Sequence, residues 1–395
     1  MDVNTATKRF TYSILLLIAG FAVAFSAISV LINHIIEHYQ LAGSDQGLVI
    51  SVLSVGNTLA VVSTLFLFRN MKKSTLLFLS GLLSVSMLAL TGVSSSFTML
   101  LLACLFIGVS FGWTDSYANS CIIDVNRDNS AKYQGALHGW YGVGAVLAPI
   151  AIQFLLVRNS WQEIYLILTP VVLLTVIVFM FTARSTGKII SEPRIKAVEF
   201  SRDEMRAFFK NKRNLCLILS MQSYSLMILA LFAWTVRYMS VQYDAEGLGI
   251  TSVTVMWVCI TISRFFASRL PISLMKLHTY GSLVACAALA VGVLSDNALI
   301  MCIMIGVSGL SSGHSMPSLI NEIVVGNEGG SQLPASIMIL TTRISGVVVP
   351  PLLGFISVFS MQASMLVPII TVLAAGLLGF AIMRLKNEKI GADAV

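Results

Sequence analysis

Long apolar stretches separated by short polar breaks follow one another along the whole chain of 395 residues. Each stretch is about 20 residues long, the length that a helix needs to cross roughly 30 Å of hydrocarbon. The pattern predicts an all-α membrane protein with twelve transmembrane helices, near residues 10–33, 44–68, 74–93, 97–122, 133–157, 161–183, 214–239, 248–270, 274–294, 298–320, 334–359 and 363–384.

The longest polar segment, residues 184–213, separates six of these spans from the other six. It carries nine basic and four acidic residues, so it is the natural linker. We therefore predict an N-terminal six-helix bundle over residues 1–183, a cytoplasmic linker over 184–213 and a C-terminal six-helix bundle over 214–395.

An internal repeat relates the two predicted bundles. The run Cys104-Leu-Phe-Ile-Gly-Val-Ser110 recurs as Cys302-Ile-Met-Ile-Gly-Val-Ser308, 198 positions later. In the same way, Gly144-x4-Pro149 recurs as Gly346-x4-Pro351. Self-similarity over such a distance indicates duplicated structural units. The two bundles are therefore expected to be parallel and pseudo-symmetric.

Composition supports a membrane protein, since 56% of the residues are apolar and only 11% are charged. The net charge of +7 would suit a nucleic-acid binder, but the basic residues gather in alternate loops, as positive-inside topology requires. We expect a bacterial inner-membrane protein with both termini in the cytoplasm. The basic residues assigned to that side are Lys8, Arg9, Arg69, Lys72, Lys73, Arg127, Lys132, those of 184–213, Arg269, Lys276, Arg384, Lys386 and Lys389.

Acidic residues dominate the loops assigned to the opposite side, where Arg158 is the one clear cation and Arg237 is left open. The six cysteines lie in or beside apolar spans without CxxC spacing, so they are interpreted as small core residues rather than disulfides or metal ligands. No phosphate-binding P-loop is present, which argues against direct use of ATP. We expect no cofactor, a monomer, and no partner beyond solute, protons and bilayer.

Two parallel six-helix halves with a solute site between them near the bilayer midplane are the arrangement of many secondary transporters. Across essentially its full length the chain resembles the major facilitator superfamily. Spans four and five resemble the fucose permease group, through Asp115-Ser-Tyr-Ala-Asn119 and Trp140-Tyr-Gly-Val-Gly144-Ala…Pro149. The resemblance implies the major facilitator fold and uptake of a sugar or similar solute with protons.

Two departures from the family patterns limit what the resemblance implies. The loop between spans two and three keeps basic residues but lacks the Asp and both glycines of the superfamily motif, so its gating ion pair is not carried over. The fucose permease group has an acidic residue in span one for proton coupling, and Ser29 stands at that place here.

Asp115 and Asn119 are the first candidates for solute binding, because ionisable groups inside apolar spans are costly and usually face a cavity or a partner. They lie one helical turn apart, so a carboxylate and an amide converge on one face. The resemblance adds a role for Asp115 in proton coupling. The alternative is a local capping or pairing role.

Aromatic and histidine side chains near these positions extend the candidate substrate site. His138 and Tyr141 share a face of span five, beside Trp140. Trp113 and Trp234 also lie within spans. An indole there either contacts the C–H surface of a sugar or packs against neighbouring helices, and both interpretations stay open.

Arg343, ten residues into span eleven, is the cation placed deepest in an apolar stretch. Three readings remain open: an ion pair with Asp115 or another acid, binding of an anionic substrate, or a structural role beside water. Gln222 in span seven and His314 in span ten complete the candidate substrate-binding residues.

Competing functions are an efflux antiporter for amphiphilic compounds, a transporter of organic anions and a membrane metalloenzyme. The 18 Met and 21 Phe suit an adaptable efflux pocket, but Gly144 and Pro149 are too far apart for an antiporter motif. The enzyme reading rests only on His34-Ile-Ile-Glu37-His38, an H-x-x-E-H pattern at a helix end. We expect no catalytic residues and no metal there.

Overall fold

The structure is a computed structural model, which describes residues 1–41, 45–64, 67–68, 71–126, 130–190, 195, 202–267, 269–326 and 332–385. Contacts divide the chain into two compact units, Met1–Val198 and Glu199–Val395. This division falls inside the segment predicted as the linker, whose exact bounds stay a prediction. Of the basic residues assigned to the cytoplasm, those outside the described residues are Arg69, Arg127, Arg194, Lys196, Lys386 and Lys389.

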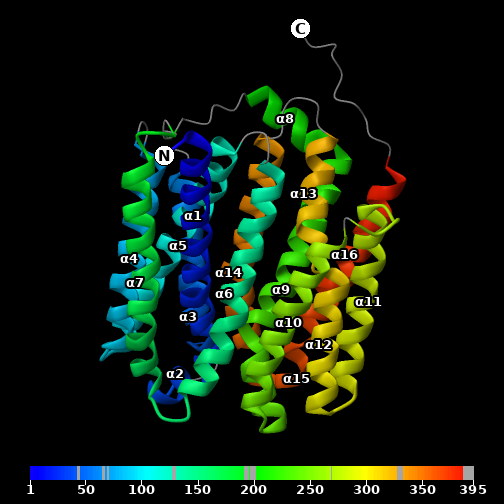
Figure 1. The fold of residues 1–395 in the computed structure, drawn as a ribbon. Helices are drawn as coiled ribbons and strands as arrows, with labels where there is room; N and C mark the ends of the chain where they lie inside the picture. The colour runs from blue at the N-terminus through cyan, green and yellow to red at the C-terminus, as the bar shows by residue number, and fades with distance from the viewer. Residues whose placement is uncertain are drawn as a thin grey trace. The chain divides into compact units, whose positions relative to one another are not determined.

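Unit 1 is a helical bundle, drawn from blue to green in Figure 1. Its core is built from apolar side chains of several helices that pack together, among them Phe10, Ile14, Phe111 and Phe179. The helices are α1 (Val3–Val30), α2 (Ile32–His38), α3 (Asp45–Ser63), α4 (Lys73–Gly92), α5 (Phe97–Val125), α6 (Ser130–Leu155) and α7 (Trp161–Thr186).

Unit 2 is also helical, and α9 contacts α10, α14 and α16 within it. A short helix, α8, precedes this bundle (Figure 1). The helices are α8 (Arg202–Lys210), α9 (Lys212–Tyr243), α10 (Glu246–Ala267), α11 (Leu274–Leu294), α12 (Ala298–Ser312), α13 (Ser315–Val325), α14 (Gln332–Phe359), α15 (Met361–Ser364) and α16 (Leu366–Arg384).

The predicted spans agree with these helices, and the all-α membrane fold is confirmed. Within the described residues, eleven stretches are long and apolar enough to cross a membrane, and Gly47–Ser63 is a shorter apolar helix. Helix ends are shifted by several residues, since α1 begins at Val3 rather than at residue 10 and α16 begins at Leu366 after the short α15. Two larger differences concern the tenth span and the linker. The tenth span is interrupted at Gly313 and His314, and residues 202–210 of the predicted linker form α8. Hydropathy alone misses α8 because it is short and its apolar residues occupy only one side.

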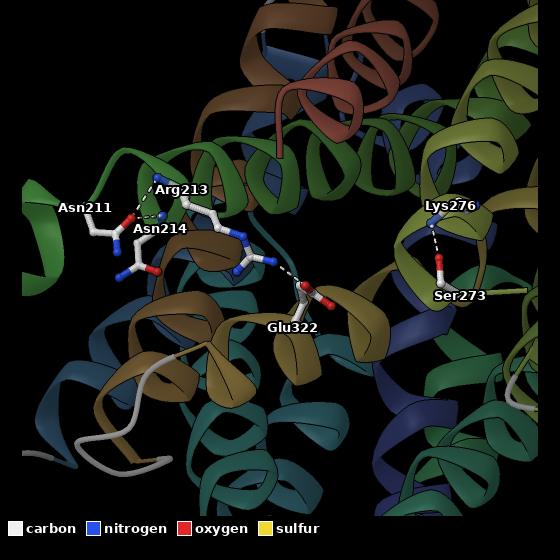
Figure 2. Close-up of polar contacts among 6 residues, drawn as sticks. All are labelled: Asn211, Arg213, Asn214, Ser273, Lys276 and Glu322. Carbon is white, nitrogen blue, oxygen red and sulfur yellow. Dashed lines mark hydrogen bonds and ion pairs between the residues drawn. The ribbon is translucent and has the colours of Figure 1, made fainter. Parts of the chain in front are cut away.

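Backbone groups at several helix ends are satisfied by polar side chains, as the orphan N–H groups of a helix start require. Ser160 and Glu163 form a reciprocal capping box at the start of α7. Asn211 Oδ1 accepts hydrogen bonds from the backbone N–H groups of Arg213 and Asn214, which starts α9 (Figure 2). Sequence-local caps therefore help to set where these spans begin.

Helices α3 and α5 approach each other so closely that only glycine fits between their backbones. A Cβ atom on Gly108 would lie 1.9 Å from the carbonyl oxygen of Leu53, and one on Gly56 would lie 1.9 Å from that of Leu105. Small residues that allow backbones to approach are the usual means of helix association in lipid, where apolar side chains gain little by leaving the solvent. This reciprocal glycine contact fixes α5 against α3.

The internal repeat has a structural counterpart in both units. Ser110 Oγ donates to the Ile107 carbonyl at 2.8 Å, and Ser308 Oγ donates to the Ile305 carbonyl at 2.7 Å. Both serines are fully buried. The repeated sequence therefore forms the same local helix structure in α5 and in α12.

Each unit contains a partly buried ion pair that the sequence analysis missed. Lys73 Nζ at the start of α4 donates to Asp124 Oδ2 at 2.6 Å, and to Ser120 Oγ. In unit 2 the guanidinium of Arg213 donates to Glu322 (Figure 2). Asp124 and Glu322 are 198 positions apart, the offset of the repeat. That offset is the signal that would have identified the pair of acids.

The glycine contact predicts a sharp difference between two Gly→Ala variants. Gly108→Ala should lower the stability of the folded protein by about 1–3 kcal/mol, because the added methyl meets a backbone oxygen that cannot rotate away. Gly135→Ala in α6 meets no atom within 4 Å, so it should leave stability unchanged or raise it by up to about 1 kcal/mol. Thermal unfolding in detergent measures both, and equal transitions would contradict the prediction.

The ion pair of unit 1 predicts a non-additive effect. Asp124→Asn leaves the Lys73 ammonium without its carboxylate, and should cost about 1–3 kcal/mol of unfolding free energy. Lys73→Met combined with Asp124→Asn removes the stranded charge, so the double variant should recover part of the loss. Denaturant unfolding of the wild type, both single variants and the double variant tests this. A double variant whose loss equals the sum of the two single losses would argue against the pairing.

Candidate functional site

Asp115 and Asn119 lie one turn apart on α5 of unit 1. Asn119 Nδ2 donates to the Asp115 carbonyl oxygen at 2.7 Å and to its carboxylate Oδ1 at 3.1 Å. Both side chains are half-buried. The amide therefore orients the carboxylate.

Aromatic rings from three helices meet one turn before Asp115. The rings of Phe111 on α5 and Phe25 on α1 stack with centroids 4.7 Å apart, and Tyr141 of α6 lies 5.9 Å from Phe111. Phe111 precedes Asp115 by four residues, so the ring and the carboxylate share a face of α5. The sequence analysis named Tyr141 but missed Phe25 and Phe111. The i, i+4 spacing from Asp115 is the signal that would have found Phe111.

The contact between Phe111 and Tyr141 also sets the height of His138 along the helix bundle relative to Asp115. Helices α5 and α6 are consecutive, antiparallel and in contact. One turn onward from Phe111 on α5 is Asp115, and one turn back from Tyr141 on α6 is His138. His138 is therefore at the same height in unit 1 as Asp115, and it is half-buried.

The two candidate tryptophans of unit 1 lie apart from this stripe of α5. Trp113 Nε1 donates to Ser63 Oγ at 2.8 Å, and its ring meets Phe68 edge to face at 5.2 Å. It precedes Asp115 by two residues and so points to a different side of α5. Trp140 is 37% exposed, on the same face of α6 as the exposed Val143. Neither indole lies beside Asp115 through a described contact.

Two candidates of unit 2 meet between α9 and α14. Gln222 Nε2 donates to Ser345 Oγ at 2.8 Å. Arg343 precedes that serine by two residues on α14 and is half-buried. Trp234, by contrast, is 1% exposed and belongs to the core of the unit. The structure therefore associates Gln222 and Arg343 with neighbouring parts of α14, and places Trp234 in packing.

His314 lies where the tenth span is interrupted, and its polar atoms serve that break. Its backbone N–H donates to Ser263 Oγ at 3.2 Å, and its ring Nδ1 lies 3.1 Å from the same oxygen. Arg264 Nε donates to the Gly313 carbonyl at 3.2 Å. Side chains of α10 thus satisfy backbone groups that a continuous helix would have paired internally.

His278 is a fully buried residue that the sequence analysis overlooked. Ser220 Oγ donates to the Ala375 carbonyl at 3.2 Å, so the same oxygen accepts from His278 Nε2 at 2.8 Å. The other ring nitrogen, Nδ1, is hydrogen-bonded to Ser315 Oγ at 2.8 Å. The ring of this α11 histidine therefore joins α9 and α13, and Ser220 extends the contact to α16. A histidine in the apolar span 274–294 was the available signal.

The H-x-x-E-H pattern occupies α2, a seven-residue helix after α1. Within the part of the chain that the structure describes, no three His, Cys, Asp or Glu side chains gather as a metal site. His38 instead packs edge to face against Tyr39 at 4.7 Å and Trp161 at 5.4 Å. The pattern therefore belongs to an aromatic cluster at one end of unit 1.

Comparison with solved structures agrees with the fold. The chain is similar to a bacterial homologue of the human lysosomal transporter Spinster, solved inward-facing and occupied, with TM-score 0.74, 15% identity and coverage of 95% of this chain and 96% of that one. The unoccupied inward-facing form gives TM-score 0.74, 15% identity, and coverage of 96% and 97%. At this identity the likeness concerns the fold alone.

Sequence comparison identifies the family. The chain matches no curated protein. The family description "Major Facilitator Superfamily" matches residues 13–331, well over half of the chain. The similarity to the fucose permease group remains an interpretation of residues in spans four and five. The chain therefore belongs to the Major Facilitator Superfamily, as a multi-pass membrane protein of secondary transport and not an enzyme.

Proposed function

We propose that the protein takes up a small polar solute, of the size and character of a sugar, together with protons. The observation that carries this proposal is the stripe on α5, where the Phe111 ring is followed one turn later by Asp115 and a further turn later by Asn119. The transporter is proposed to act as a monomer in the bacterial inner membrane, with both termini in the cytoplasm.

The chemistry of the stripe suits an amphiphilic ring such as a sugar. Aromatic rings offer apolar faces to C–H groups, and here the half-buried Tyr141, packed beside the buried Phe111, supplies such a ring. The Asp115 carboxylate accepts hydrogen bonds from hydroxyl groups, and the Asn119 amide both donates and accepts. A solute with alternating C–H and O–H surface would therefore find both kinds of contact where α5 and α6 meet.

Proton coupling is proposed to run through Asp115. A charged carboxylate inside an apolar helix is costly unless it faces water, a partner or a bound proton. Alternating access moves the site between two aqueous sides, and a proton that travels with the solute neutralises the carboxylate during that change. His138, at the same level of unit 1, is the group through which a proton would reach or leave Asp115.

A second candidate function is transport of an organic anion, and Arg343 favours it. The guanidinium is half-buried in the middle of α14, close in sequence to the serine that Gln222 binds. Arg presents paired N–H donors that match a carboxylate in a bidentate arrangement. An anionic solute would engage Arg343, whereas a neutral sugar would depend on the stripe of α5.

Asp115→Asn tests the coupling. The amide keeps the shape and hydrogen bonding of the side chain but does not take up a proton, so accumulation driven by an imposed pH gradient in vesicles should be abolished. Solute binding, and exchange without a gradient, should persist. Glu37→Gln, which removes an exposed carboxylate at the end of α2, serves as the control and should accumulate solute normally. Accumulation by Asp115→Asn at the wild-type level would rule out the coupling role.

Arg343→Lys separates the two candidate substrates. It keeps the positive charge but loses the paired donors, so affinity for an anionic solute should fall by roughly tenfold or more, in line with the 1.5–3 kcal/mol of a charged hydrogen bond. Affinity for a neutral sugar should change little. Binding measured by calorimetry on purified protein with sugars and sugar acids distinguishes these outcomes. Unchanged affinity for an established anionic substrate would remove Arg343 from the site.

A further inference from the structure

The nine-residue helix α8 has an apolar side that its own unit covers only in part. Phe208 is 3% exposed, and its carbonyl accepts a hydrogen bond from Asn214 Nδ2 at 3.2 Å, which ties α8 to the start of α9. Met205 and Phe209, on the same side of the helix, are 39% and 42% exposed. Since α8 lies outside the predicted spans, these large apolar side chains are not explained by a transmembrane position.

The helical wheel of α8 places basic residues directly beside this apolar side. With 100° per residue, Met205, Phe208 and Phe209 cover one arc, and Arg206 and Lys210 follow on the flank away from Phe208. Both basic side chains are exposed. On the wheel, Glu204 follows Phe208 on the other flank, so the cations line one side of the apolar face. An apolar face bordered by basic residues is typical of helices that lie in the plane of a membrane surface.

The short connection between α8 and α9 sets the distance of α8 from the hydrocarbon region of the membrane. Asn211, with an extended backbone, separates the two helices, and Figure 1 shows α8 at an angle to α9 rather than in line with it. The apolar part of α9 begins at Leu215, five residues after Lys210. With four helical residues and one extended residue that separation is roughly 9 Å, comparable with the headgroup layer outside the hydrocarbon.

We propose that α8 is a membrane-surface anchor that binds anionic phospholipid in the leaflet at its end of unit 2. Met205 and Phe209 enter the boundary between headgroups and acyl chains, while Arg206 and Lys210 contact headgroup phosphates. The charge of the two cations selects anionic over zwitterionic lipid, since basic residues near a membrane surface are each attracted to negative lipid. Phe208 keeps the helix attached to its own unit. This proposal does not depend on the transported solute.

Depth-dependent fluorescence quenching tests which side of α8 meets the bilayer. Single cysteines are introduced by Phe209→Cys or by Ala207→Cys, which lies on the opposite side, in a background whose six native free cysteines are replaced. Each is labelled with bimane in nanodiscs that contain phosphatidylglycerol with brominated or ordinary acyl chains. We expect several-fold stronger quenching at position 209 than at 207. Equal quenching at the two positions, or none at 209, would overturn the proposal.

Lipid retention tests the headgroup contact. Native mass spectrometry counts phosphatidylglycerol molecules retained by the wild type and by Arg206→Ala/Lys210→Ala, with phosphatidylcholine as the zwitterionic reference. Retention of phosphatidylglycerol should fall several-fold in this double variant. Lys188→Ala/Lys276→Ala removes the same charge from other exposed positions and should retain lipid as the wild type does. Unchanged retention in Arg206→Ala/Lys210→Ala would overturn the proposal even if position 209 is quenched.

Discussion

The close approach of α3 and α5 is the contact on which the arrangement of unit 1 depends. In hydrocarbon, apolar side chains gain little by meeting each other rather than lipid, so helices associate through tight packing of backbones. Gly56 and Gly108 allow this packing from both sides at once. Asp115 lies two turns beyond Gly108 on the same helix, so the glycine contact fixes both the rotation and the depth of the carboxylate. The position of Asp115 therefore depends on Gly56 and Gly108, two residues without a side chain.

The sequence predicted the features that repeat along one helix. Hydropathy identified the spans because each one must cover the same thickness of apolar solvent, and the i, i+4 spacing identified Asp115 with Asn119 because both lie on one helix. It did not identify the cluster of Phe25 and Phe111, since a contact between α1 and α5 has no local signature. Trp113 shows the same limit, because its partner Ser63 lies 50 residues away.

The interrupted tenth span shows where hydropathy is uninformative. The apolar pattern continues across Gly313 and His314, so it predicts one helix from 298 to 320. The interruption depends on the polar partners Ser263 and Arg264 of α10, which only the folded unit brings beside it. The histidine His278 was missed for a related reason, since each of its two partners is supplied by a different helix.

The interruption has a mechanical consequence for unit 2. A continuous helix resists bending through its whole hydrogen-bond ladder, whereas here a rod of 15 residues and a rod of 11 residues meet at two residues held by side chains of other helices. The span is therefore expected to bend more easily at Gly313 and His314 than within α12 or α13. Because Gly313 and His314 are hydrogen-bonded to Arg264 and Ser263, a bend at this point would move α10 together with α12 and α13.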